Sequence, residues 1–243
     1  LFRSVAPLQE LIERIKGHWE HEKLSYIQRN TNRLLHLVNQ LMDYRRAELG
    51  IFELRPVYAN AYKKVLNCFL NYENLSKRKD IDYNLYTELQ DEELLFDETY
   101  LDLIVNNLLS NAFKYTEKGE CITVRLYKED NNLVLQVIDT GVGIPAEKQK
   151  KIFERFYQAE SGHEGSGIGL SLVQRLVELH HGHITLESKV GEGSTFSIYI
   201  PQDKSMYTSE ELLAQEEGAK EQRAYYTNAH DVYIDDEELL ETS

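Results

Sequence analysis

The sequence contains only two cysteines, Cys68 and Cys121, and four prolines in 243 residues. The cysteines fit no zinc-ligand spacing, so we expect core thiols rather than a disulfide framework. No apolar run reaches the roughly 18 residues that a membrane-spanning helix needs, and no signal peptide is recognisable. Since residue 1 is not methionine, we interpret the chain as part of a longer protein that makes no membrane contact within these residues.

The sequence also lacks a cluster of basic residues. Its formal net charge is −14, and residues 203–243 hold 12 acidic and only 3 basic residues, so the remainder is nearly balanced. A nucleic-acid-binding domain usually carries a positive patch, and we therefore expect no nucleic-acid partner. Residues 202–243 read as an acidic linker or tail, in which SEELLAQEEGAKEQ fits a helix that begins at a Ser cap.

The most informative segment is VNNLLSNAFKY at 105–115. Apolar residues recur there at helical spacing and predict one buried stripe, formed by Leu101, Ile104, Val105, Leu108, Leu109 and Ala112. Asn107, Asn111 and Lys114 lie four and three residues apart, which places them together on another flank of the same helix. An Asn carbonyl oxygen suits Mg²⁺ and a Lys ammonium suits phosphate, although a solvated polar edge would give the same pattern.

Three glycine-rich segments follow this helix. LVLQVIDTGVGIP at 133–145 is an apolar strand that ends in Asp139 and two glycines, GSGIGL at 165–170 opens a helical pattern, and GEGSTF at 191–196 leads into a strand. Backbone N–H groups of a glycine-rich loop that opens a helix form a ready phosphate site. A carboxylate at the end of a strand can accept a hydrogen bond from an adenine amino group.

Together these segments, with IFERFYQ at 152–158, resemble the N, G1, G2, G3 and F boxes of the histidine-kinase branch of the gyrase/chaperone/MutL-type ATPases. The resemblance covers about residues 30–200. It implies an α+β fold, in which an N-terminal helical hairpin precedes a two-layer α/β sandwich with a mostly antiparallel sheet, the Bergerat-type ATP-binding fold. The segregation of helices from antiparallel strands favours the same architecture.

The resemblance implies ATP and Mg²⁺ as cofactors. It assigns catalysis to Asn107 and Lys114, the metal to Asn111 and adenine recognition to Asp139. The nucleotide-binding residues that it implies are Asn107, Asn111, Lys114, Tyr115, Asp139, Gly141, Gly143, Ile144, Phe156, Gly165, Gly167, Ile168, Gly169, Leu170 and Thr195. Arg155 could reach the γ-phosphate or could be an ordinary surface residue. An amide at position 107, where hydrolytic relatives carry a Glu, cannot act as a general base, so we expect slow hydrolysis.

Local patterns predict the elements of the domain between residues 51 and 201. We expect strands at 51–57, 81–89, 122–126, 133–138, 183–188 and 194–200, and helices at 59–77, 98–115, 147–153 and 169–181. The residues EDNN at 129–132 predict a hairpin turn.

Residues 1–50 predict a helical hairpin, with helices at 7–19 and 22–48. In the second helix, residues 27, 31, 34, 38, 41 and 45 alternate in steps of four and three, which is the 3.5-residue period of a bundle seam. One apolar seam cannot be buried by the hairpin alone, so we expect a homodimeric four-helix bundle through residues 7–48. A helical appendage packed on the main domain remains an alternative.

No acceptor box of the H-E-x-R-T-P kind is visible, and we expect it around or before Leu1. His18, His21 and His36 do not fit it, and the lid AESGHE at 159–164 is short for the family. We interpret the chain as the cytoplasmic core of a membrane-anchored sensor histidine kinase, of the hybrid type, which would signal to a response-regulator receiver domain. The alternative is a degenerate ATP-binding dimer scaffold without autokinase activity.

Two other enzyme classes share single motifs with this chain. Asp139-Thr140-Gly141 is also the aspartic-protease triplet, but that class needs an all-β body and a second carboxylate. GSGIGL does not meet the G-x-G-x-x-G spacing of a dinucleotide loop. A chaperone or mismatch-repair type of ATPase is disfavoured by Asn107, since those enzymes need a carboxylate there.

Overall fold

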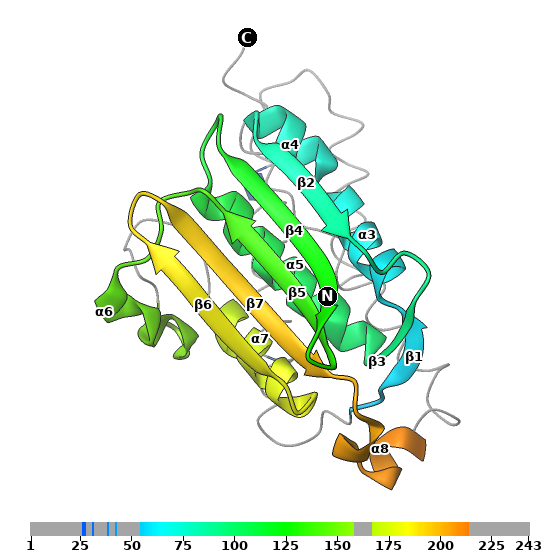
Figure 1. Cartoon of the computed structure of the whole chain (residues 1–243). Helices are drawn as coiled ribbons and strands as arrows, with labels where there is room; N and C mark the ends of the chain where they lie inside the picture. Colours follow the sequence, from blue (N-terminus) through cyan, green and yellow to red (C-terminus); the bar gives the residue numbers. More distant parts are fainter. Residues whose placement is uncertain are drawn as a thin grey trace.

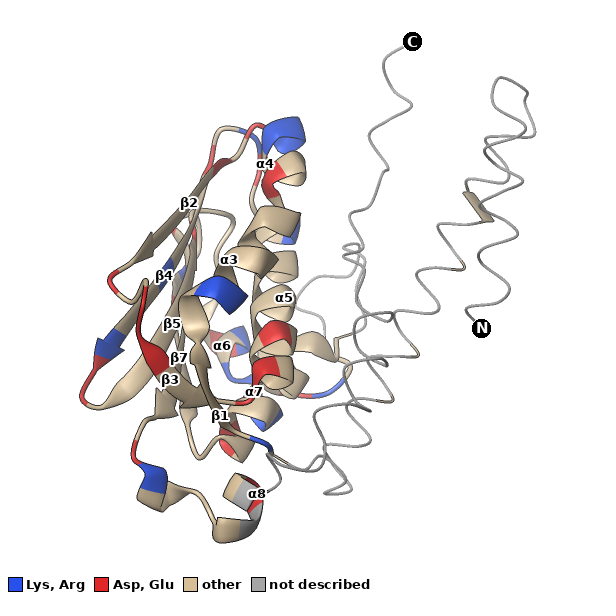
Figure 2. Ribbon diagram, turned by 90° about the vertical axis from the view of Figure 1, so that its right-hand side faces the viewer, with Lys and Arg blue, Asp and Glu red and all other residues tan. Residues whose placement is uncertain are grey.

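The computed structural model describes residues 54–157 and 167–213, with five isolated helical positions between 26 and 42. The described ranges form two layers, a five-stranded sheet with helices packed on one of its faces (Figure 1; Figure 2). The predicted hairpin and dimer seam lie almost wholly outside the described residues. Within those residues, no helix combines the length and the apolar character needed to cross a membrane.

The main sheet has the order β2-β4-β5-β7-β6. Its strands are β2 (Asp82–Thr87), β4 (Cys121–Glu129), β5 (Asn132–Asp139), β7 (Gly193–Pro201) and β6 (His183–Lys189). Only the β2–β4 pair is parallel, which confirms the mostly antiparallel sheet that the sequence predicts. Asp130 and Asn131 both have positive φ in the β4–β5 turn, as a tight hairpin requires.

Three helices cover one face of this sheet (Figure 2). They are α3 (Ala61–Asn71), α5 (Glu98–Tyr115) and α7 (Gly169–Leu179). Alternate strand residues such as Ile122, Val124 and Leu126 are fully buried against the apolar stripe of α5, whereas Arg125 on the opposite face is exposed. The bounds of α5 confirm the helix predicted at 98–115.

Several predicted bounds differ from the structure. The helix expected at 59–77 is two helices, α3 and α4 (Glu73–Lys79), which meet at Tyr72; the ring of this residue is buried and stacks on Phe113 at 5.2 Å. The helix expected at 147–153 is α6 (Ala146–Gln149) followed by a short 3₁₀ turn, η1 (Lys151–Phe153).

A second, two-stranded sheet was only partly anticipated. Strand β1 (Val57–Asn60) starts where the strand predicted at 51–57 should end, and it pairs with β3 (Glu93–Phe96), which the sequence did not predict. The four residues of β3 are too few for a recognisable alternation, and their pairing is set by contacts distant in sequence.

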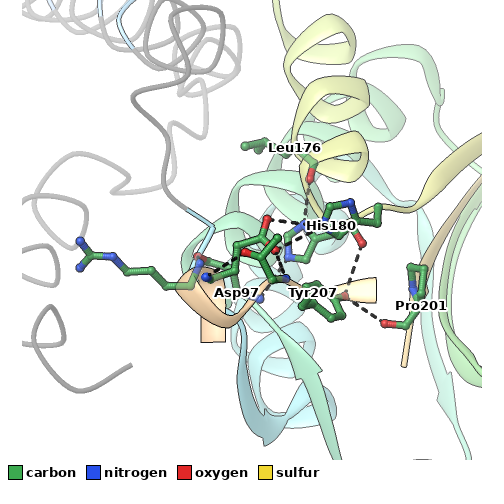
Figure 3. Close-up of polar contacts among 9 residues, drawn as sticks. Asp97, Leu176, His180, Pro201 and Tyr207 are labelled. Atoms are coloured by element: carbon green, nitrogen blue, oxygen red, sulfur yellow. Dashed lines mark hydrogen bonds and ion pairs between the residues drawn. The ribbon is translucent and has the colours of Figure 1, made fainter. Parts of the chain in front are cut away.

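A buried polar cluster joins this small sheet to α5 and α7 (Figure 3). The carboxylate of Asp97 caps α5 by accepting from the backbone N–H groups of Thr99 and Tyr100, and it also accepts from Arg55 N at 2.9 Å. The backbone N–H of Asp97 donates to His180 Nε2 at 3.1 Å, while His180 Nδ1 lies 2.8 Å from Leu176 O. Since a carbonyl only accepts and an N–H only donates, His180 is the neutral tautomer with its proton on Nδ1.

Burial controls the charges of this cluster. It raises the pKa of Asp97 to about 6, although three backbone N–H groups favour the carboxylate, and it lowers the pKa of the fully buried His180 to about 4. His180 is therefore neutral at pH 7, as its hydrogen bonds also require.

Residues 202–213 continue beyond β7 and pack against the domain. The hydroxyl of the buried Tyr207 donates to Pro201 O at 3.0 Å and lies 3.4 Å from His180 O (Figure 3). After the 3₁₀ turn η2 (Lys204–Met206), α8 (Ser209–Leu213) starts with reciprocal hydrogen bonds between Thr208 and Glu211. The cap of the predicted helix is thus Thr208, one residue before the expected Ser. The domain bounds at 50 and 201 stay predictions.

Candidate nucleotide site

The C-terminal half of α5 carries the predicted polar edge. Asn107, Asn111 and Lys114 are all half-buried, and each lies about one turn from the next. The Nδ2 of Asn107 donates to Leu103 O at 2.8 Å, which leaves its side-chain oxygen directed at the start of α7. The Nζ of Lys114 lies 4.7 Å from the centre of the Tyr115 ring. The helix therefore presents one amide oxygen in a fixed position and a cation about two turns further on.

The start of α7 meets this edge. A Cβ on Gly169 would lie 2.7 Å from Asn107 Oδ1, so a side chain at this position would displace the Asn107 amide. The preceding Ile168 is buried and Leu170 is half-buried. The described end of the segment predicted as the phosphate loop thus lies against Asn107 of α5.

Gly167 closes the base of the loop that precedes α7. It has φ +67°, and a Cβ on it would lie 2.6 Å from the carbonyl carbon of Phe156. The backbone N–H of Phe156 donates to Gly167 O at 2.9 Å, and the Phe156 side chain is 65% exposed. Phe156 is therefore not a core residue of the domain. Gly165 lies outside the described residues.

Asp139 ends β5, the central strand of the sheet, and the loop that follows it reaches the C-terminal end of α5. Its carboxylate is buried and accepts hydrogen bonds from the backbone N–H of Gly141, at 3.0 Å, and from that of Ser194. Burial raises the pKa of Asp139 to about 6 despite these two bonds. A buried acceptor next to a glycine loop can receive an N–H donor from a planar base, which agrees with the predicted adenine role.

The glycines that follow Asp139 are required by the protein itself. A Cβ on Gly141 would lie 2.0 Å from Tyr115 O, and a Cβ on Gly143 would lie 2.1 Å from Lys189 O. The sequence suggested that these glycines admit the nucleotide base. In the structure they allow the loop to pack on the end of α5 and on the β6–β7 turn.

Ser194, the neighbour of the predicted Thr195, lies beside Asp139. In the β5–β7 ladder Asp139 pairs with Ser194 and Ile138 pairs with Thr195. Because side chains alternate along a strand, Thr195 points to the sheet face opposite to Asp139. Only the strand register could have revealed this, and the register depends on long-range pairing.

The described residues also enclose a hollow of about 430 Å³ outside this set. Its lining consists of Gln149, Lys150, Phe153, Glu154, Gln174 and Leu186. None of the predicted nucleotide-binding residues is among them. Within the described ranges, no group of three or more His, Cys, Asp and Glu side chains could hold a metal ion, so the protein alone forms no metal cage there. The amide edge of α5 instead suits a cation that takes its other ligands from phosphate and water.

Comparison with known proteins agrees with this geometry. Residues 96–204 match the family of histidine kinase-, DNA gyrase B- and HSP90-like ATPases. The chain is 29% identical over 245 residues to a histidine kinase of Formosa agariphila, which covers 98% of this chain and 18% of that protein. It is 33% identical over 189 residues to the circadian input-output histidine kinase CikA of Synechococcus elongatus, covering 75% of this chain and 25% of the relative.

Solved structures show the same fold. Full-length ShkA in complex with AMPPNP superposes with a TM-score of 0.69 at 24% identity, covering 82% of this chain and 44% of ShkA. The catalytic domain of the histidine kinase ThkA gives a TM-score of 0.56 at 24% identity, covering 61% of this chain and 99% of that domain. The chain spans only 18–38% of the length of the first curated relatives that it matches.

Proposed function

Because residues 96–204 form an ATPase domain of the histidine kinase, DNA gyrase B and HSP90-like family and the relatives are named histidine kinases, we propose that this chain is the catalytic core of a sensor histidine kinase. It binds Mg²⁺–ATP and transfers the γ-phosphoryl group to a histidine. Two observations carry the proposal: Asn107 of α5 meets the start of α7, and the carboxylate of Asp139 is buried at the end of β5.

Different side chains serve the two ends of the nucleotide. Asp139, with its carboxylate held by Gly141 and Ser194, accepts from the exocyclic amino group of adenine. At the other end, Asn111 offers its amide oxygen to the cation, and Lys114 offers positive charge to phosphate. When bound, Mg²⁺ neutralises phosphate charge and orients the γ-phosphoryl group for transfer.

Asn107 favours transfer over hydrolysis. Its Nδ2 is engaged by Leu103 O, and its oxygen faces Gly169. An amide has no useful basicity near pH 7, so Asn107 cannot deprotonate a water molecule. ATP therefore persists until an acceptor imidazole reaches it.

The acceptor histidine is not supplied by any recognisable box in this sequence. A second candidate function follows from that observation: an ATP-binding dimer scaffold without autokinase activity. The two candidates share the nucleotide site and differ only in phosphotransfer.

We further propose that the chain dimerises through residues 7–48. Two predicted seam residues, Ile27 and Val38, are 50% and 44% exposed in the single chain. A second copy that covered them would remove this apolar surface from water.

A response-regulator receiver domain is the expected partner, since a structure of ThkA in complex with the response regulator TrrA is similar to this chain with a TM-score of 0.63 at 21% identity. The cytoplasmic, membrane-anchored setting stays a prediction.

Calorimetric titration tests the nucleotide site. The chain should bind ADP and ATP more tightly with Mg²⁺ than with EDTA, and Asn111→Ala should remove most of that Mg²⁺ dependence. If Asn111→Ala binds ADP in EDTA as tightly as the wild-type chain does but gains little from Mg²⁺, only the metal ligand is lost. If its binding in EDTA also falls, the site itself is damaged. Undiminished enhancement of binding by Mg²⁺ in Asn111→Ala would overturn the assignment.

A second experiment separates the kinase from the scaffold. A kinase should transfer phosphate from labelled ATP to a helical hairpin with an intact acceptor box, added in trans, whereas a scaffold should not.

A further inference from the structure

The loop that follows Asp139 is tied to the β6–β7 turn by backbone and side-chain hydrogen bonds. The backbone N–H of Ile144 donates to Ser188 Oγ at 2.8 Å, and the N–H of Gly191 donates to Val142 O at 2.9 Å. Gly143 lies against Lys189 O too closely for any side chain. The loop therefore takes its position from the turn as well as from α5.

Ser188 uses its whole hydrogen-bonding capacity at this junction. Its hydroxyl donates to Gly193 O at 2.9 Å and accepts from Ile144 N. The hydroxyl of Ser194 lies 3.0 Å away. A serine hydroxyl has one proton, so the Ser194 hydroxyl must be the donor in that last contact.

Gln149, at the end of α6, spans the same junction from outside. Its Nε2 donates one proton to Ile144 O and the other to Ser188 O, both at 2.9 Å. Both protons of the amide are thus used, and both go to backbone carbonyls of the two segments that Ser188 joins. The side chain is half-buried, which shields these bonds from competing water.

This network ends at the carboxylate of Asp139. Ser194, which bonds Ser188 through its hydroxyl, also donates its backbone N–H to the Asp139 side chain. The neighbouring Gly193 lies so close to Asp139 O that a Cβ on it would be 2.0 Å away. A shift of the β7 start would therefore move the carboxylate, and a shift of the loop would move the backbone that faces the base.

We propose that Ser188 and Gln149 are positioning residues of the adenine subsite, which keep the 141–145 loop and the start of β7 at the spacing that selects adenine over guanine. Neither residue touches the base. Ser188 acts through the backbone N–H of Ile144 and the hydroxyl of Ser194, and Gln149 acts through the backbone carbonyls of Ile144 and Ser188. This inference rests on the proposed nucleotide site and adds two residues that control its base selectivity.

The chain offers a matched control pair. Gln136 and Ser197, the same two residue types, form a side-chain bond from Nε2 to Oγ at 2.9 Å between β5 and β7, on the opposite face of the sheet. Ser197→Ala and Gln136→Leu therefore remove comparable bonds from the same strands without touching the loop.

The test measures Kd for ADP and for GDP by calorimetry, in the full 243-residue chain, together with the urea midpoint. Ser188→Ala and Gln149→Leu should weaken ADP binding about fivefold, the effect of losing one ordinary hydrogen bond, with a smaller change for GDP. The ADP/GDP selectivity should fall accordingly. Ser188→Thr, which keeps the hydroxyl, should restore it, and the control pair should change the urea midpoint but not the selectivity.

The outcomes separate this inference from the function on which it rests. If the wild-type chain binds no ADP, the proposed nucleotide site itself fails. If the wild-type chain binds ADP selectively and the Ser188 and Gln149 variants keep that selectivity, only the positioning roles are refuted. Selectivity that falls equally in the control pair also refutes them. If one of the two variants does not fold, the other decides.

Discussion

The side-chain oxygen of Asn107 lies 2.7 Å from the point where a Cβ on Gly169 would stand. This contact joins the helix that carries the predicted metal and phosphate residues to the helix that follows the predicted phosphate loop. Gly169 has an ordinary helical conformation, so its role is to leave space and not to supply an unusual φ.

Gly169→Ala should therefore impair nucleotide binding through Asn107. The new methyl group displaces the amide oxygen, while alanine is intrinsically a better helix former than glycine, so stability should change little. We expect ADP affinity to fall by about tenfold, the cost of one well-placed contact to a charged ligand. Calorimetry measures the affinity, and urea unfolding measures the stability.

A double-mutant cycle supplies the control for that prediction. In an Asn107→Ala background the alanine at 169 has no amide to displace, so its effect on ADP binding should largely vanish. Additive effects of the two substitutions would show that Gly169 acts independently of Asn107.

Adenine binding should depend on pH through Asp139. Burial raises the pKa of its carboxyl to about 6, above the ordinary 3.8, so this group stabilises the empty domain at low pH and that contribution is lost as pH rises through 6. Nucleotide needs the ionised form as an acceptor. At pH 5 only about one molecule in ten carries it, so ADP affinity should fall about tenfold between pH 7 and pH 5.

The phosphates of ADP titrate in the same range, and Asp139→Asn corrects for them. Its pH profile should keep only the nucleotide's own titration, and its preference for adenine over guanine should be reduced because an amide can donate as well as accept. Identical profiles for wild type and variant, or an unchanged base preference, would assign adenine recognition to another group.

Tyr207→Phe should destabilise the domain although Tyr207 lies outside the predicted 51–201 domain. The substitution removes a hydroxyl that donates to Pro201 O and lies near His180 O, and leaves buried carbonyls with fewer partners. The loss should be about 1–2 kcal/mol of unfolding free energy, measured in urea. Tyr86→Phe is a suitable control because that side chain is 59% exposed, and an equal effect there would argue against a special role for Tyr207.

The chain should hydrolyse ATP very slowly. Asn107 cannot act as a general base, so we expect bound ATP with little release of inorganic phosphate. Asn107→Glu could raise hydrolysis if its carboxylate aligns a water molecule, although repulsion from phosphate opposes the gain. Brisk phosphate release by the wild-type chain, in a coupled phosphate assay, would favour a hydrolytic ATPase over a kinase.

Local patterns in the sequence predicted the parts of the fold that depend on short-range periodicity. The apolar stripe of α5 and the turn at 129–132 are of this kind, and the structure confirms both. The break at Tyr72 was not predictable, since no glycine or proline marks it and the buried ring packs against Phe113, 41 positions away in the chain. Propensity gives way to tertiary packing there.

The candidate site shows the same division. Asn107, Asn111 and Asp139 could be proposed from the sequence because helix spacing and the end of a strand mark them, independently of how the strands pair. Ser194 was missed in favour of its neighbour because the β5–β7 register decides which of the two faces Asp139. Nothing in the sequence points to Ser188 or Gln149, the two residues proposed to position the loop, because an isolated serine on a strand and a glutamine on a short helix carry no local signal.

The Asp97–His180 pair, finally, lies where the chain enters and leaves the domain. The incoming chain is bonded to it at Arg55 and the outgoing chain at Tyr207, so both covalent connections share one anchorage. Asp139 lies at the far end of β5, about 23 Å from the end where β5 pairs with Pro201, at 3.3 Å per residue. A rotation of the domain about that anchorage would therefore move the Asp139 end of β5 much further than it moves the residues that follow β7.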